Sequence, residues 1–138
     1  MNLMLHPMLV HFPIALWALA LTYEIGHLIL KNEDLHKTAV LIAWAAVFFT
    51  PLAVATGLWE QVKHHLNHPV LNQHKQYAFM VLGVSLVCLP VLIGLHLRPS
   101  KFLRKILFVC LLLATIGVGL AGFYGGKLVF EYSVGVEP

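Results

Sequence analysis

Histidines are the residues of this chain best suited to chemistry, because a neutral imidazole nitrogen binds haem iron and first-row metal ions. The chain has nine histidines among 138 residues. Cys88 and Cys110 form no CxxC or CxxCH motif, so we expect them to be small packing residues. The histidines form no HExxH motif either, and their use as ligands therefore depends on the fold. Six of them concern the argument below: His6, His11, His64, His65, His68 and His74.

Four apolar segments, at residues 8–30, 38–62, 77–97 and 106–130, are each long enough to cross a bilayer, which takes about 20 residues. The chain is 59% hydrophobic and only 11% charged. A soluble domain of this length could not bury so much apolar surface. We therefore predict an all-α integral membrane four-helix bundle of up-down-up-down topology, with residues 1–138 as a single domain.

The basic residues predict which way this bundle faces. Six Lys or Arg residues fall in the connections 31–37 and 98–105, and three fall at the other ends of the spans. By the positive-inside rule, those two connections are cytoplasmic. The six histidines and both termini are then on the external or periplasmic side of the membrane. The net charge of +3 is modest and lies mainly in short loops, so lipids and not nucleic acids are the expected surroundings.

We interpret the histidines first as ligands of a b-type haem. His11 lies near the start of the first span and His74 near the start of the third, and these two spans run in the same direction. Their imidazoles could hold haem iron from its two sides. His6 is the reserve ligand, because it lies about 140° around an ideal helix from His11. Gly122 and Gly126 form a GxxxG pair in the last span, which would let a flat macrocycle approach. Such a protein would be a membrane electron-transfer subunit.

The same face could instead hold a non-haem transition-metal ion. Glu60 and His64 are four residues apart and share a helix face if the helix continues that far. Nitrogen and oxygen ligands of this kind suit zinc, copper or iron. The ligands of this alternative are His6, His11, Glu60, His64 and His74.

A third interpretation is a structural accessory subunit without a cofactor. The sequence shows no nucleophile–base pair, no phosphate loop and no carboxylate dyad, so catalysis on a substrate of its own has the least support. A non-catalytic electron-transfer or accessory subunit is the expectation.

Prolines inside the apolar segments predict local bends. Pro13 either bends the first helix or makes it restart, because proline breaks the hydrogen-bond ladder beyond the first turn. Pro51 frees a backbone carbonyl one turn back, which Thr50 or a neighbouring helix has to satisfy.

Three polar side chains lie towards the other ends of the spans. Glu24 is interpreted as a bundle-facing or interfacial carboxylate. His27 and His96 are interpreted chiefly as interfacial side chains. A second haem between them would lie roughly 30 Å from the first, too far for efficient direct electron transfer.

Three motifs along the chain also resemble those of a known family. Residues 6–16, HPMLVHFPIAL, resemble an HPxxVHFPIAL opening, and residues 56–60, TGLWE, continue the match. Residues 125–136 resemble a GGxLVYxxGVGV ending, with Phe130 where tyrosine is usual. These motifs are those of a bacterial four-span membrane family, the domain of unknown function family 2231.

The resemblance covers nearly the whole chain and transfers four positions of interest, His6, His11, Glu60 and His74. Relatives of this type occur alongside cytochrome c and Rieske iron–sulfur domains. The resemblance therefore implies a respiratory electron-transfer setting, with quinone, cytochrome c or a Rieske-type protein as partner, which is association and not chemistry.

Overall fold

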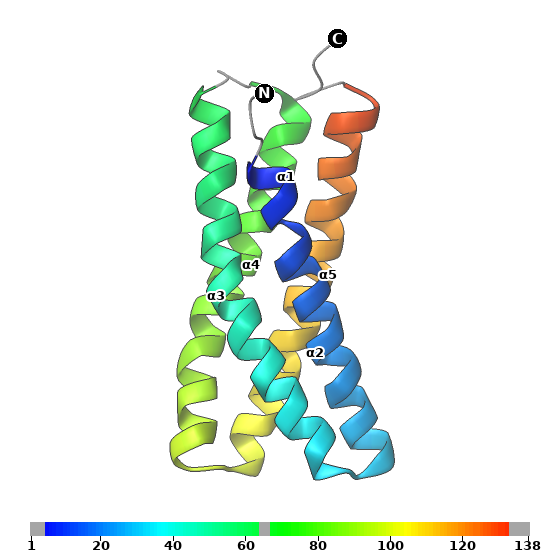
Figure 1. The fold of residues 1–138 in the computed structure, drawn as a ribbon, viewed down its shortest axis with the longest axis vertical. Helices are drawn as coiled ribbons and strands as arrows, with labels where there is room; N and C mark the ends of the chain where they lie inside the picture. Colours follow the sequence, from blue (N-terminus) through cyan, green and yellow to red (C-terminus); the bar gives the residue numbers. More distant parts are fainter. Residues whose placement is uncertain (1–4, 64–66, 133–138) are drawn as a thin grey trace.

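The computed structural model describes residues 5–63 and 67–132, which form an all-helical bundle (Figure 1). A short first helix is followed after one residue by a long one, and three further long helices complete the chain. The elements are α1 (Leu5–Leu9), α2 (His11–Leu30), α3 (Glu33–Lys63), α4 (Pro69–Leu97) and α5 (Lys101–Phe130).

The four long helices run up-down-up-down, and α1 continues the line of α2 (Figure 1). Helix α2 packs against α3 and α5, and α4 packs against the same two helices. Helices α2 and α4 therefore lie on a diagonal of the bundle. Helix α1 contacts α2 and α3. The start of α1 and the end of α5 lie at one end of the bundle, opposite the connections between α2 and α3 and between α4 and α5.

The surface of the bundle is that of a membrane protein. Four helical segments are long and apolar enough to cross a membrane, with α1 and α2 together forming the first. Large apolar side chains point outward along them, such as Leu41 at 71% exposed and Phe48 at 63%. The core is narrow and built around Trp17, which is 0% exposed and packs among small side chains such as Ala20, Ala43 and Ala114. The predicted all-α membrane four-helix bundle is confirmed.

The helices extend beyond the apolar spans because polar side chains cap them. His68 precedes α4, and its side chain accepts a hydrogen bond from Val70 N, with Pro69 in the first turn. Ser100 does the same for Leu103 N at the start of α5. His74 therefore lies in the second turn of α4 and not in a loop before it.

Both prolines singled out in the sequence have structural consequences. The first span breaks at Val10, one turn before Pro13, because proline has no N–H for the Leu9 carbonyl and its ring clashes with it. Helix α3 continues through Pro51. The carbonyl that Pro51 leaves without an intrahelical donor belongs to Val47, and Ser85 of α4 donates to it at 3.4 Å. A neighbouring helix thus satisfies the freed carbonyl, as predicted.

A chain of hydrogen bonds ties the core helices to one another. Trp17 Nε1 of α2 donates to Thr50 Oγ1 of α3 at 3.0 Å, and that hydroxyl donates to the Ala46 carbonyl at 2.7 Å. Thr115 Oγ1 of α5 lies 3.1 Å from the Trp17 carbonyl and 2.7 Å from the Leu111 carbonyl of its own helix, and its one proton is shared between the two. Because Trp17 and Thr50 are buried, neither group has water as an alternative partner.

We expect Thr50→Val to lower the free energy of unfolding by about 1 kcal/mol, because it leaves the buried Trp17 N–H without an acceptor. Thr22→Val is the matched control, since the exposed Thr22 hydroxyl donates only within its own helix, to the Ala18 carbonyl. Reversible unfolding in mixed detergent micelles measures both. Equal losses in the two variants would contradict a role for the Trp17–Thr50 hydrogen bond in holding α2 to α3.

Candidate functional site

A cavity of about 930 Å³ lies between the helices at the end of the bundle where α1 begins and α5 ends. It is lined by residues of every helix, from α1 to α5, and most of its wall is apolar. The polar side chains along its wall include those singled out in the sequence. They are His6, His11, Glu60 and His74, together with Thr50, Gln61 and Lys75.

His6 is held against α3 by its backbone and by its ring. Its backbone N–H donates to Glu60 Oε1 at 2.9 Å, so a carboxylate lies at the N-terminus of α1, where the helix dipole favours it. Its Nδ1 donates to the Ala53 carbonyl at 2.9 Å. The ring lies over Gly57, where a Cβ would be only 2.7 Å from His6 Cε1. Only glycine at that position leaves room for the imidazole.

His74 is held against α5 in the same way. Its Nδ1 donates to the Ala121 carbonyl at 2.8 Å, and its ring lies over Gly125, where a Cβ would be 3.3 Å from Cε1. For both His6 and His74, the carbonyl that accepts from the ring belongs to an alanine four residues before the glycine. The missing Cβ exposes a helix carbonyl that would otherwise be covered. Two Ala-x-x-x-Gly segments thus seat two imidazoles.

These hydrogen bonds fix the tautomer of both imidazoles. A carbonyl oxygen can only accept, so Nδ1 carries the proton in each ring and the neutral ring has its lone pair on Nε2. Histidines that ligate metals typically donate their other N–H to a carbonyl in this way. The two ring centroids lie 6.1 Å apart with an interplanar angle of 83°. The rings that line the cavity are therefore oriented before any ligand is bound.

The other predicted ligands are placed less centrally. His11 also lines the cavity, but its side chain is exposed and its Nδ1 donates to the Pro7 carbonyl in the preceding turn at 2.7 Å. Glu60 lies on the cavity wall, with one carboxylate oxygen engaged by the His6 backbone. His64 lies outside the described residues. The structure brings His6 and His74 together, and the use of any of these residues as ligands stays a prediction.

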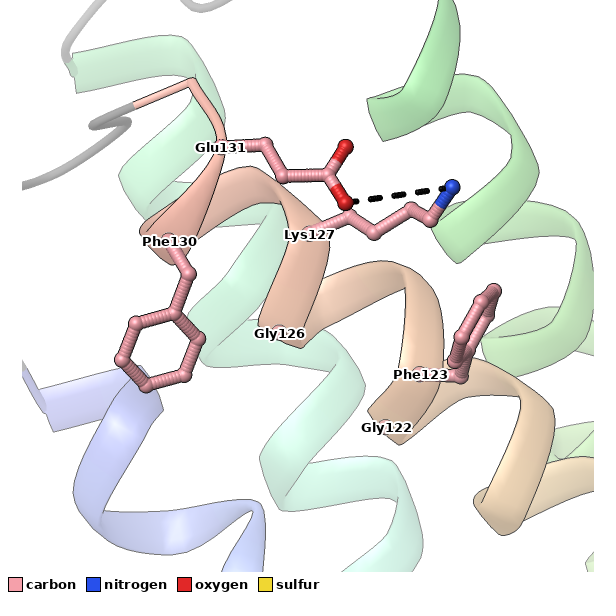
Figure 2. A pocket seen from close by; sticks show the side chains of 6 residues that line it. All are labelled: Gly122, Phe123, Gly126, Lys127, Phe130 and Glu131. Carbon is pink, nitrogen blue, oxygen red and sulfur yellow. Dashed lines mark ion pairs between the residues drawn. The ribbon is translucent and has the colours of Figure 1, made fainter.

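Gly122 and Gly126 lie on the face of α5 that borders the cavity. A Cβ at Gly126 would meet no atom within 4 Å, and one at Gly122 would meet only Ile14 Cδ1, at 3.9 Å. Figure 2 shows the two glycines on one face of α5 between the side chains of Phe123 and Phe130. They border a shallow hollow of about 330 Å³ there as well. This stretch of α5 therefore leaves open space beside both glycines, and the approach of a macrocycle to it stays a prediction.

Sequence reasoning missed a second polar cluster at the other end of the bundle. Glu24 and His36 are both buried, and His36 Nδ1 lies 2.8 Å from Glu24 Oε2. His27 lies beside them, with its ring centroid 5.2 Å from that of His36. The sequence signal that could have found His36 is the helix start at Asn32, followed by an acidic first turn. That signal places His36 on a helix opposite Glu24 and not in a loop.

The family model described as "Predicted membrane protein (DUF2231)" matches residues 2–138. The chain belongs to the DUF2231 family. The match covers almost the whole sequence, so it includes both Ala-x-x-x-Gly segments and both polar clusters. The comparison with curated proteins found no match, and neither did the comparison with solved structures.

We expect Gly57→Ala to lower the free energy of unfolding by about 1–3 kcal/mol, because the new Cβ pushes the His6 ring off α3. In a His6→Ala background the same change should stabilise the protein by up to about 1 kcal/mol, the helix preference of alanine over glycine. A double-mutant cycle in mixed micelles measures the coupling.

Gly83→Ala is the matched control, since Gly83 is exposed and a Cβ there meets no atom within 4 Å. It should be neutral or stabilising in both backgrounds. If Gly57→Ala lowers the free energy of unfolding equally with and without the His6 side chain, the imidazole does not pack against Gly57.

Proposed function

We propose that this membrane protein binds a b-type haem between His6 and His74 and transfers single electrons as a subunit of a respiratory assembly. One observation carries the proposal. Two imidazoles from different helices, each anchored through Nδ1 to a backbone carbonyl, line one largely apolar cavity with their ring centroids 6.1 Å apart. Axial ligation by histidine is a common way to hold haem in a helical bundle.

The separation of the rings suits one metal atom between them. With metal–nitrogen bonds of about 2 Å, two imidazoles on opposite sides of a metal have centroids about 6 Å apart. The volume of about 930 Å³ lies within the range of roughly 300–1,000 Å³ that is usual for cofactor sites. Bound haem would supply one-electron redox chemistry. The chain's own contribution is to fix the imidazoles and to keep water away with an apolar wall.

Haem is favoured over a bare metal ion because the described residues around His6 and His74 supply too few donors for an ion. A zinc-type site takes three or four protein ligands, whereas haem brings four nitrogens of its own and needs one or two axial ligands. Within residues 5–63 and 67–132, His6 and His74 belong to no set of three His, Cys, Asp or Glu side chains with donor atoms all within 4.8 Å. Glu60, the expected third ligand, instead caps α1.

The geometry also favours His6 over His11 as the partner of His74. His6 is half-buried and hydrogen-bonded to the neighbouring helix α3, whereas His11 is exposed and hydrogen-bonded to Pro7 in the preceding turn of the chain. His11 lies on the cavity wall and is kept as the competing ligand. Lys75 lines the same cavity and donates to Gln61 Oε1 at 3.2 Å, and its ammonium group would be a partner for a haem propionate.

The proposed setting is a bacterial inner membrane with the His6–His74 end facing the periplasm. This orientation rests on the excess of Lys and Arg at the opposite end. The electron donor or acceptor would then be a quinol in the bilayer or a periplasmic redox protein such as a cytochrome c or a Rieske-type protein.

Reduced-minus-oxidised absorption spectra of the full chain, produced with haem supplied, test the proposal. We expect an α-band with one haem per chain, lost in His6→Ala and in His74→Ala. His96→Ala is the control, because His96 is exposed at the other end of the bundle, and its spectrum should be unchanged. His11→Ala should keep the α-band.

Three other outcomes would each decide against part of the proposal. A protein without haem but with a stoichiometric metal ion would favour the non-haem alternative. A band lost in His11→Ala and kept in His6→Ala would make His11 the ligand. A chain that folds without any cofactor, with spectra and metal content unchanged by all the substitutions, would leave the structural accessory role.

Single-cysteine labelling tests the orientation. In a Cys88→Ala/Cys110→Ala background, Asn67→Cys at the His74 end should react with a membrane-impermeant maleimide on intact spheroplasts. Lys101→Cys at the other end should react only after lysis. Both positions are exposed, and the two native cysteines are buried. The reverse pattern would place the cavity on the cytoplasmic side.

A further inference from the structure

A second cluster of ligating side chains lies where α2 ends and α3 begins, at the end of the bundle opposite the large cavity. Glu24 and His27 belong to the last two turns of α2, and His36 belongs to the start of α3. Each offers one donor atom, and these atoms all lie within 4.8 Å of one another. We propose that Glu24, His27 and His36 bind a divalent transition-metal ion, independently of the proposed haem.

A tight turn between α2 and α3 brings the three side chains together. Lys31 ends α2 in the left-handed conformation, with φ of 53°, and its N–H donates to the His27 carbonyl at 2.8 Å. Asn32 Oδ1 then accepts from Asp34 N at 2.9 Å and starts α3. A connection of two residues leaves the first turn of α3 beside the last turns of α2. The ligands are therefore set on two rigid helices and not on a loop.

The backbone of this turn also prepares His27 for ligation. His27 Nδ1 donates to the Asn32 carbonyl at 2.9 Å, so this nitrogen carries the proton and the lone pair lies on Nε2. His27 Nε2 lies 4.0 Å from Glu33 Oε1. The hydrogen bond from His27 to the Asn32 carbonyl is the kind that orients metal-ligating imidazoles. The side chain of His27 is 12% exposed, which leaves an ion a route in from the surface.

Glu24 and His36 form the buried half of the site. Glu24 is 2% exposed and His36 is 6% exposed, and His36 Nδ1 lies 2.8 Å from Oε2 and 3.1 Å from Oε1 of the carboxylate. The hydrogen bond places a proton between Nδ1 and the carboxylate. For an ion to take that place, Nδ1 gives up this proton to solvent while Nε2 carries the N–H of the ring, so that a neutral imidazole and the carboxylate both coordinate. A buried carboxylate is costly unless a positive charge compensates it, and the ion provides that charge.

Glu33 lies at the edge of this three-residue cluster and is held there by α5. Arg104 Nη1 lies 2.9 Å from both Glu33 Oε1 and Oε2, which holds the carboxylate beside His27. The donor set is two imidazoles and one carboxylate from α2 and α3, which leaves a further coordination position for water. The Glu33 carboxylate, oriented by Arg104, adds negative charge beside the site.

This donor set selects the class of ion. Magnesium and calcium prefer oxygen ligands alone, whereas two imidazoles with carboxylates suit zinc, iron and their first-row neighbours. In a tetrahedral site with bonds of about 2.0–2.1 Å, donors lie roughly 3.3 Å apart. The donor atoms of Glu24, His27 and His36 lie within 4.8 Å of one another, so only a small movement would bring them to this distance. The contact between His36 and Glu24 is already short.

Zinc titration of the full chain in detergent, after removal of metal with a chelator, tests the proposal. Equilibrium dialysis should give one bound Zn²⁺ per unsubstituted chain. In Glu24→Gln and in His27→Gln the affinity for Zn²⁺ should be at least about 100-fold weaker. Co²⁺ in place of Zn²⁺ should show ligand-field absorption that disappears in the same variants. His96→Gln, at the same end but exposed, is the control and should bind as the unsubstituted protein does.

Zn²⁺ should also raise the melting temperature of the unsubstituted protein and of His96→Gln, but not that of His27→Gln. If Glu24→Gln fails to fold, the His27→Gln variant tests the proposal alone, because the His27 side chain lies at the more exposed edge of the cluster. The haem spectrum should be unchanged in both variants, so this site and the His6–His74 site can fail separately. Absence of Zn²⁺ binding, or binding that survives both substitutions, would overturn the proposal.

Discussion

Inside a bilayer a polar group has to find its partner within the protein, because hydrocarbon offers none. Throughout residues 5–63 and 67–132, every buried side-chain nitrogen or oxygen has a hydrogen-bond partner. Several of these bonds join one helix to another: Trp17 to Thr50, Ser85 to the Val47 carbonyl, and His36 to Glu24. Apolar helix surfaces gain little by leaving lipid for one another, so polar links and close packing of small residues carry much of the association. The position of each polar residue therefore fixes how its helix sits in the bundle.

The same constraint shapes the large cavity. An imidazole there can bond to a neighbouring helix only where a backbone carbonyl is exposed, and glycine four residues further on exposes it for both His6 and His74. The rings are consequently held in one tautomer and one orientation by the fold alone. Groups that are ordered in advance lose little conformational freedom when a ligand arrives, which favours tight binding. The cluster around Glu24 obeys the same rule, with the Asn32 carbonyl orienting His27.

The sequence predicts features that act locally and misses those that depend on how helices meet. Apolar length predicts four crossings, and Pro51 predicts a carbonyl in need of a partner, because both effects are confined to one segment. The pairing of His6 with His74 depends on the break at Val10 and on Gly57, which helical spacing along one span does not encode. His36 looks like a loop residue until the helix start at Asn32 is recognised, and its contact with Glu24 then follows from the short connection.

The break at Val10 divides the first span into two helices, α1 and α2, that contact different parts of the bundle. Helix α2 is fixed in the core by Trp17, whereas α1 buries none of its residues and is tethered to α3 through His6. Tilting the short helix about Val10 would alter the gap between the two imidazoles and leave the interior packing intact. The position of the His6 imidazole therefore depends on the short α1 and its contacts with α3, whereas the packing around Trp17 is set by the long helices.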